Sequence, residues 1–165
     1  MDRTTQIITV IEKNPGIKFR EIMRETGMKN GVLGYYADKL EREGAVKIDR
    51  SPGQTRFYPP GIADDDILLI KNLRQETPRQ ILASLLHHKT LSFNELVLKT
   101  QKSPATVSLY LAQITRDSLI ESKIVDFKKR YYVRDVEKLQ KIIDKYHPSL
   151  IESSADHLAD TFSSF

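Results

Sequence analysis

Apolar residues in the first part of the chain follow a helical period and then an alternating one. Between residues 4 and 43 they recur at three- and four-residue spacing in three stretches, which predicts three short helices. Asn14-Pro15-Gly16 ends the first stretch, Gly27 the second and Gly44 the third, because proline and glycine interrupt or cap helices. The predicted inner faces are formed by Ile7, Ile8, Val10, Ile11, Phe19, Ile22, Met23, Leu33, Tyr36, Ala37 and Leu40.

A β-hairpin is predicted directly after the third helix. Polar and apolar positions alternate over residues 45–50, and residues 55–58 form a second extended run. Between them lies Ser51-Pro52-Gly53-Gln54, a turn composition in which proline presets φ and glycine accepts a positive φ.

The same pattern returns 74 residues further along the chain. Thr4–Tyr58 overlays Pro78–Tyr132 without a gap, and nine positions are identical. Because the apolar positions also match, a duplicated unit explains the pattern better than chance, and two units favour two small tandem domains. The identical pairs are Gln6/Gln80, Ile7/Ile81, Phe19/Phe93, Glu21/Glu95, Thr26/Thr100, Tyr36/Tyr110, Arg42/Arg116, Arg56/Arg130 and Tyr58/Tyr132.

Local signals predict where the helices of the second unit begin. Thr77-Pro78 and Ser103-Pro104 each have the order of an N-cap followed by proline, for the first and third helices. Ser92 and Glu95 have the spacing of a capping box for the second helix. A hairpin is predicted from residues 119–125 and 130–133, with its turn at Asp126-Phe127-Lys128-Lys129.

Three helices followed by a hairpin is the order of a winged helix-turn-helix. Segments Asn14–Pro59 and Thr90–Val133 resemble winged-helix regulators of the MarR and ArsR type. The first segment is most similar to archaeal tandem regulators such as the euryarchaeal archaellum regulator. The resemblance implies a mainly α fold with small β-hairpin wings, of α+β class. The expected domains are a first winged helix at residues 1–61, a linker helix with the second at 62–134, and C-terminal helices at 135–165.

The segments outside the two units are predicted to be helical. Asp64-Asp65-Asp66 precedes apolar residues, and acidic residues stabilise a helix N-terminus, so a connecting helix is favoured over a metal site there. In the tail, Pro148 is predicted to separate two amphipathic helices. Their apolar stripes pack either on the second unit or in a dimer interface. A homodimer is preferred, and its expected contacts are Val136, Leu139, Ile143, Tyr146, Ile151, Leu158 and Phe162.

Charge and composition narrow the function classes. The 165 residues carry a net charge of +4 and contain no cysteine, which excludes disulfides, thiolate catalysis and Cys-ligated zinc. The net charge is +3 over residues 1–62, 0 over 63–90, +4 over 91–134 and −3 over 135–165. The two repeated units are thus the basic parts, which favours a polyanionic partner. No motif of an enzyme, cofactor or metal site is present, so neither catalysis nor a cofactor is expected.

Candidate DNA contacts lie on the third helix of each unit and on the hairpins. Helix starts and outward helix faces read bases in the major groove, and basic wing tips contact phosphates or the minor groove. The paired Arg56 and Arg130 are the strongest candidates for such a wing contact. The predicted contacts are Lys29, Asn30, Gly31, Val32, Gly34, Tyr35, Lys39, Arg50 and Arg56 in the first unit, with Ser103, Ala105, Thr106, Ser108, Leu109, Gln113, Lys128, Lys129 and Arg130 in the second.

Structural alternatives stand beside several of these residues. Asn30 has the composition of an N-cap, and Tyr36 and Tyr110 are more typical of packed positions than of contacts. The predicted function is a sequence-specific transcription regulator that binds double-stranded DNA at promoters, located in the cytoplasm with the nucleoid. The basal transcription machinery is a further possible partner, and no membrane partner is expected. The alternative is a tandem winged-helix protein-interaction subunit of a transcription or chromosome complex.

Overall fold

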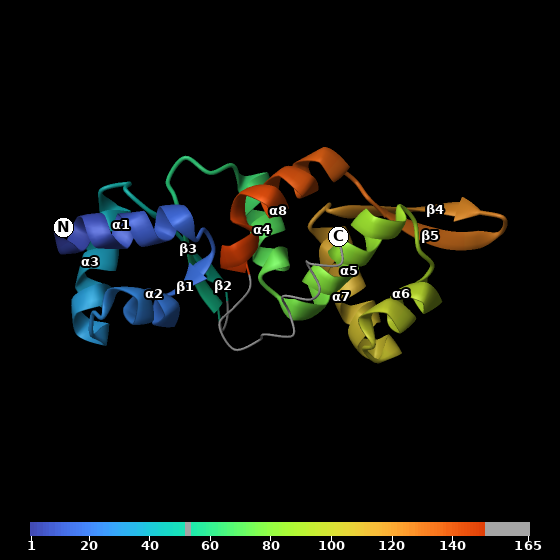
Figure 1. Ribbon diagram of the computed structural model, residues 1–165, viewed down its shortest axis with the longest axis horizontal. Coiled ribbons are helices and arrows are strands. Elements are labelled where there is room, and N and C mark those ends of the chain that lie inside the picture. The colour runs from blue at the N-terminus through green and yellow to red at the C-terminus, as the bar shows by residue number, and fades with distance from the viewer. Residues whose placement is uncertain (52–53, 151–165) are drawn as a thin grey trace. The chain divides into compact units, whose positions relative to one another are not determined.

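The computed structural model describes residues 1–51 and 54–150, with side chains up to Tyr146, and divides into two compact units, Met1–Ile67 and Leu68–Phe165. Helices and small antiparallel sheets make up both units (Figure 1). The turn predicted at Ser51–Gln54 includes Pro52 and Gly53, which lie outside the described residues.

Unit one packs three helices against a small sheet. Its strands are antiparallel in the order β1-β3-β2. The elements are α1 (Arg3–Lys13), β1 (Ile17–Lys18), α2 (Phe19–Thr26), α3 (Asn30–Arg42), β2 (Lys47–Ser51) and β3 (Gln54–Tyr58). The buried apolar core consists of Ile7, Ile11, Ile17, Ile22, Leu33, Ala37, Leu40, Val46 and Phe57. The three predicted helices and the predicted hairpin are therefore confirmed in this unit.

Unit two repeats this order after a connecting helix, α4 (Asp64–Leu73), whose first turn carries the three aspartates. The elements that follow are α5 (Glu76–His88), α6 (Phe93–Thr100), α7 (Pro104–Arg116), β4 (Ile120–Val125), β5 (Lys128–Val133) and α8 (Val136–Leu150). The buried apolar side chains of α5 to β5 include Ile81, Leu82, Ala83, Leu85, Leu91, Leu96, Val107, Leu111, Ile114, Ile120 and Val133.

The same contacts recur in both units at the 74-residue spacing. Thr26 donates its hydroxyl to the carbonyl of Ile22 at 2.7 Å, and Thr100 donates to Leu96 at 2.8 Å. The hairpins also have one register, because each pair in β2–β3 reappears 74 residues later in β4–β5. Examples are Lys47↔Tyr58 with Glu121↔Tyr132, and Asp49↔Arg56 with Lys123↔Arg130.

The helix starts agree with the predicted caps in two cases and differ in one. Ser92 forms the predicted capping box with Glu95, and Ser103 caps α7, with Pro104 as its first residue. Helix α5 begins earlier than Thr77-Pro78, at Glu76, with Gln75 as N-cap. Helix α8 extends through Pro148 to Leu150, so the predicted interruption at Pro148 was wrong.

Candidate nucleic-acid interface

Helices α2 and α3 form a helix-turn-helix in unit one. Gly27 caps α2 with φ of +73°, a left-handed conformation that glycine adopts without a steric cost, and donates its amide to Met23 at 2.8 Å. The connection to α3 is only Gly27-Met28-Lys29. Within it, the amide of Met28 donates to the hydroxyl oxygen of Thr26 at 3.3 Å. This tight turn sets the direction of α3 relative to α2.

Helix α3 buries one face and presents the other to solvent. Leu33, Ala37 and Leu40 are buried, and they fix the rotation of the helix about its axis. Of the predicted contacts, the exposed ones are Lys29, Asn30, Gly31 and Tyr35, and the partly buried ones are Val32, Gly34 and Lys39. Tyr35 is 61% exposed and packs edge-on against Tyr36.

The start of α3 lacks a side-chain cap. Lys29, and not Asn30, is the N-cap residue, and its side chain makes no capping hydrogen bond. Asn30 is the first residue of the helix, so the N-cap alternative for Asn30 was wrong. The first amide groups of a helix carry partial positive charge and have no partners within the helix. An anion can therefore bind at this end of α3.

Two glycines on α3 are not required by the fold. A Cβ atom added at Gly31 or Gly34 would have no neighbour within 4 Å, and neither residue has a positive φ. Each glycine nevertheless costs a helix about 1 kcal/mol relative to alanine. The absence of side chains here leaves space for another molecule to approach the backbone of α3 closely.

Arg50, on strand β2 of unit one, is held by helix α3. Its guanidinium donates to the two carboxylate oxygens of Glu41 at 2.6 and 2.8 Å. This hydrogen bonding lowers the pKa of Glu41 and raises that of Arg50. Arg50 is therefore paired with an acidic side chain of its own unit, although its side chain is 54% exposed.

The paired arginines both bind partners inside their own units. Arg56 is only 1% exposed, and it donates to the carbonyl of Gly16 at 2.9 Å. Arg130 donates to the hydroxyl and carbonyl of Thr90 at 2.9 and 3.1 Å, and it lies 3.0 Å from a Glu95 oxygen. The prediction of a DNA contact is therefore wrong for Arg56, and the Arg130 guanidinium is occupied by internal partners.

Helix α7 carries the predicted contacts of unit two. Ser103, Ala105, Ser108 and Leu109 are exposed, and Thr106 is partly buried. Gln113 is directed elsewhere, because it donates to Asn72 at 2.8 Å and to Gln75 at 3.3 Å. Asn72, on α4, is fully buried. The Gln113 amide therefore joins α7 to α4, and the predicted contact of Gln113 with DNA stays a prediction.

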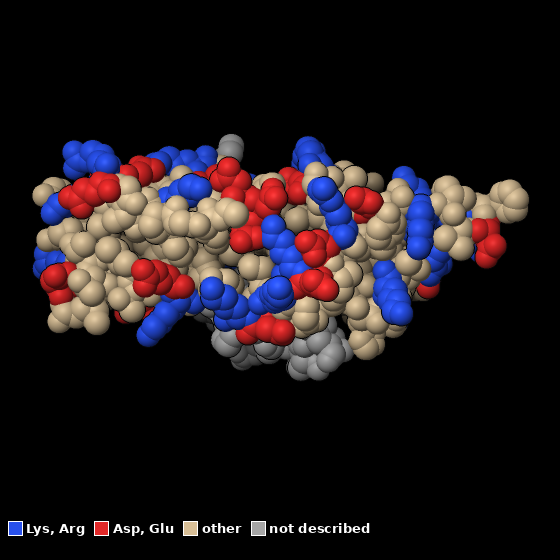
Figure 2. All heavy atoms as spheres, turned by 90° about the horizontal axis from the view of Figure 1, so that it is seen from above, with Lys and Arg blue, Asp and Glu red and all other residues tan. Residues whose placement is uncertain are grey.

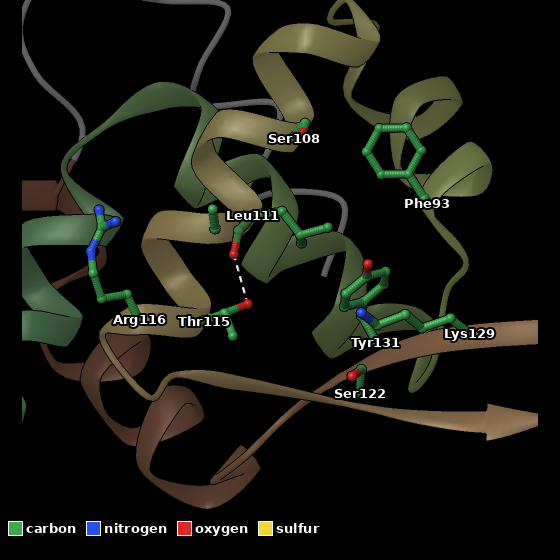
Figure 3. Close-up of a pocket in the computed structure, with 9 residues that line it drawn as sticks. Phe93, Ser108, Leu111, Thr115, Arg116, Ser122, Lys129 and Tyr131 are labelled. Carbon is green, nitrogen blue, oxygen red and sulfur yellow. Dashed lines mark hydrogen bonds between the residues drawn. The ribbon is translucent and has the colours of Figure 1, made fainter.

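A groove of about 460 Å³ lies between α7 and the wing formed by β4 and β5. Its apolar floor includes Phe93, Leu111 and Tyr131, and Lys129 lies along the wing, 5.5 Å from the Tyr131 ring centroid (Figure 3). The Arg116 side chain points away from the rings of Phe93 and Tyr131. Lys128 and Lys129 are both exposed, as the sequence predicted for a basic wing.

Sequence reasoning missed the most exposed apolar side chain of the wing. Phe127 is 101% exposed at its tip. The local sequence indicates only a turn here, although Phe127 stands 74 residues after Gly53. A bulky apolar residue aligned with a turn glycine was the available signal.

The predicted dimer contacts divide into three groups. Leu139 and Ile143 are 1% and 2% exposed, so they pack within the chain and are not interface residues. Val136 is 52% exposed and Tyr146 is partly buried. The remaining predicted contacts, Ile151, Leu158 and Phe162, lie outside the described residues.

Charge is mixed on the face seen in Figure 2, where Lys and Arg alternate with Asp and Glu, so total charge does not single out a binding surface there.

Among residues 1–51 and 54–150, no group of three or more His, Asp or Glu could hold a metal ion. In the same part of the chain, no helix combines the length and apolar character needed to cross a bilayer.

Comparison with known proteins finds similarity in the N-terminal part of the chain and to two solved structures. Residues 1–66 match the family described as HTH_HVO_0163_N, N-terminal HTH domain, which covers less than half of the chain. HlyU from Vibrio cholerae N16961 is 27% identical with a TM-score of 0.44, over 51% of this chain and 89% of HlyU. The transcriptional repressor PagR of Bacillus anthracis is 22% identical with a TM-score of 0.44, over 49% of this chain and 91% of PagR. TM-scores of this size do not by themselves establish a shared fold. No curated protein matches the sequence.

Proposed function

We propose that this chain is a sequence-specific DNA-binding transcription regulator with two tandem winged-helix units. The proposal rests on the start of α3, where Lys29, Asn30 and Gly31 are exposed within residues that match a helix-turn-helix family. An α-helix fits the major groove, and there each base pair presents a distinct pattern of donors, acceptors and methyl groups.

Each exposed group at this end of α3 has a specific role in the proposal. Lys29 and the first amides of α3 bind a backbone phosphate, because both carry positive charge. Asn30 reads adenine through its paired amide donor and acceptor. Gly31 and Gly34 let the helix backbone lie close to the bases, and Tyr35 contacts the strand beside them.

Unit two contributes a second contact surface in this proposal. The methyl groups of Ala105 and Thr106 suit thymine methyls, and Ser108 suits a phosphate or a base edge. Lys129 lies across the groove from α7, and both Lys129 and its neighbour Lys128 are exposed. A sugar-phosphate strand held between α7 and the wing would meet donors from both elements.

The proposed regulator acts by occupying promoter DNA, where it blocks or recruits the basal transcription machinery without a catalytic step of its own. It works as a homodimer in the cytoplasm, associated with the nucleoid. The assembly contacts are assigned to the acidic tail beyond Leu150, which would be repelled by the phosphate backbone.

A salt titration on DNA tests this function. Genomic fragments recovered with the full chain would be bound at increasing salt, and the affinity should fall steeply because each phosphate contact releases counterions. Lys29→Ala should reduce the slope of log K against log salt by about 0.9, the value for one phosphate contact. Asn30→Ala should weaken binding about tenfold at adenine-containing sites and relax the preference for them.

Lys141→Ala provides the charge-matched control. Lys141 is exposed on α8, far along the chain from the proposed contacts, so its loss should leave the salt slope unchanged. Equal slopes for wild type, Lys29→Ala and Lys141→Ala would contradict the assignment of α3. A full chain that recovers no genomic fragments at low salt would contradict DNA binding itself.

A further inference from the structure

The wing of unit two projects from the body of the unit and ends in an apolar tip. Residues 121–129 are all exposed, from the second residue of β4 to the second residue of β5. Asp126 and Phe127 form the two-residue turn between the strands, with φ of +51° and +62°. Positive φ at both positions is typical of the primed turns that match the twist of a hairpin.

Phe127 is costly at this position in two ways. Its side chain is 101% exposed, so the ring gains no packing from the chain. Its backbone is in the left-handed region, where a bulky residue is strained and glycine or asparagine is favoured. Unit one has Gly53 at the aligned position. The folded chain does not benefit from this phenylalanine, which indicates a partner outside the chain.

The neighbours of Phe127 combine apolar and basic side chains. Ile124 is 68% exposed and Val125 is 39% exposed, which extends the apolar surface along the wing. Lys128 and Lys129 directly follow Phe127 and are exposed. Asp126 is the one acidic residue of the turn, and aspartate tolerates the left-handed conformation that the turn requires. Figure 2 shows uncharged atoms at the very end of this hairpin, with charged side chains behind them.

We propose that Phe127 is an apolar wedge that enters the minor groove and partly unstacks one base step, while Lys128 and Lys129 bind the phosphates beside it. This proposal rests on the proposed DNA-binding function and adds a deformation of the DNA to it. A single ring on a two-residue turn can enter a groove about 6 Å wide. Inserted apolar side chains of this kind bend the duplex toward the major groove. Pyrimidine–purine steps are the expected sites, because they unstack most easily.

Duplex DNA fits these observations better than a protein partner. An apolar protein surface would match Phe127 and Ile124, but it would not compensate the adjacent exposed lysines. The minor groove offers stacked bases at its floor and phosphates on both rims, so one ligand satisfies both kinds of side chain.

The test compares DNA bending by the full chain and two variants at Phe127. Recovered genomic fragments would carry a fluorophore at each end, so that energy transfer reports the bend while anisotropy reports affinity. Phe127→Asn removes the ring but suits the positive φ, so its melting temperature should equal or exceed that of wild type. This variant should lose the bend and bind about tenfold more weakly, as expected when one base–aromatic stacking contact is lost. Phe127→Leu should keep most of the bend, because leucine also serves as a wedge.

The outcomes distinguish the wedge from the DNA-binding function. Wild-type and Phe127→Asn chains that bend and bind DNA equally, while Lys29→Ala still lowers the salt slope, would overturn the wedge and leave the function intact. The same equality, together with loss of a co-purifying protein in Phe127→Asn, would also overturn it and assign the tip to a protein partner. Absence of any wild-type DNA binding would overturn both proposals.

Discussion

Arg56 and Arg130 show that one repeated residue serves the fold of each unit. Their carbonyl partners, Gly16 and Thr90, are themselves separated by 74 residues, so the same internal bond occurs twice. Each bond joins the last strand of its hairpin to the loop after the first helix. Burial decides the role of Arg56, because a residue that is 1% exposed cannot reach a phosphate without a rearrangement.

Arg56→Ala should therefore act on stability and not on the salt dependence of DNA binding. Removing the guanidinium leaves the Gly16 carbonyl without this donor and creates a cavity, so we expect the free energy of unfolding to fall by about 2–4 kcal/mol. Arg130→Ala should cost less, about 1 kcal/mol, because the Arg130 side chain is 27% exposed and solvent screens its ion pair with Glu95. Urea denaturation measures both values. An unchanged midpoint with a reduced DNA salt slope would restore the wing-contact hypothesis.

Glu95 should make stability depend on pH in the acid range. Hydrogen bonds from the amide and hydroxyl of Ser92, followed by the charge of Arg130, lower the pKa of Glu95 below its usual value of 4.5. A carboxylate with a lowered pKa in the folded state contributes stability above its unfolded pKa, and this is lost as the pH falls through the folded value. Glu95→Gln keeps a capping-box residue but cannot titrate. Its melting temperature should fall less than that of wild type between pH 5 and 3, and parallel curves would contradict this assignment.

Ser103 is the N-cap of helix α7, and it also lies where a DNA contact is proposed. Its hydroxyl oxygen accepts from the Thr106 amide at 3.2 Å. Ser103→Ala should lower the free energy of unfolding by about 1 kcal/mol through loss of the cap. Ser103→Asn and Ser103→Asp should both retain stability, since both residues cap helices well. Only the aspartate should weaken DNA binding, because it places a charge against the phosphates. Equal affinities for the Asn and Asp variants would remove Ser103 from the interface.

Gln113 joins helices α7 and α4, so its removal should lower the free energy of unfolding. The Gln113 amide donates to Asn72, whose own amide donates to Asp117 at 2.8 Å. Gln113→Ala leaves the buried Asn72 oxygen without this donor, which should cost about 1–3 kcal/mol. Leu109→Ala is the comparison on the same helix, because Leu109 is 66% exposed and should leave stability nearly unchanged. A stable Gln113→Ala variant with weakened DNA binding would instead support base contact.

The sequence predicted elements better than it predicted the direction of polar side chains. Periodic apolar positions determine which helix face is buried, so Leu33, Ala37 and Leu40 could be assigned to the core from spacing alone. The assignment of Arg56 failed, and the internal hydrogen bonds of Gln113 were not predicted, because their partners, Gly16 and Asn72, lie about 40 residues away in sequence. Spacing along one element contains no information on such contacts. Phe127 was missed for a related reason, since turn composition alone does not show which residue stands at the tip.

At the scale of the whole molecule, the modest net charge of +4 combines basic repeated units with a tail of net −3. If the tail joins two copies, the dimer presents each recognition helix twice about a two-fold axis. Such a regulator reads two half-sites of a palindromic operator, with a spacing set by the dimer. Under the proposed function, the oligomeric state would therefore determine the form of the DNA sequence that the protein recognises.

The tail stripe beyond Leu150 can be tested without disturbing α8. Because Leu139 and Ile143 are buried, removing all of residues 135–165 would damage the fold and could not report on assembly alone. The double variant Leu158→Asp with Phe162→Asp instead changes the apolar stripe in the full chain. We expect light scattering to show a dimer for wild type and a monomer for this variant at the same concentration, because two charges oppose burial of the stripe.

Ser153→Asp with Ser164→Asp supplies the matched control for this experiment, because it adds the same charge at polar tail positions outside the stripe. The control should remain dimeric and should protect both half-sites in a footprint, whereas the stripe variant should protect them only at higher protein concentration. This difference follows because a dimer holds its second unit near the second half-site, so that binding there is effectively intramolecular. A monomeric wild type, or dimers for all three proteins, would exclude the tail stripe as the dimer contact.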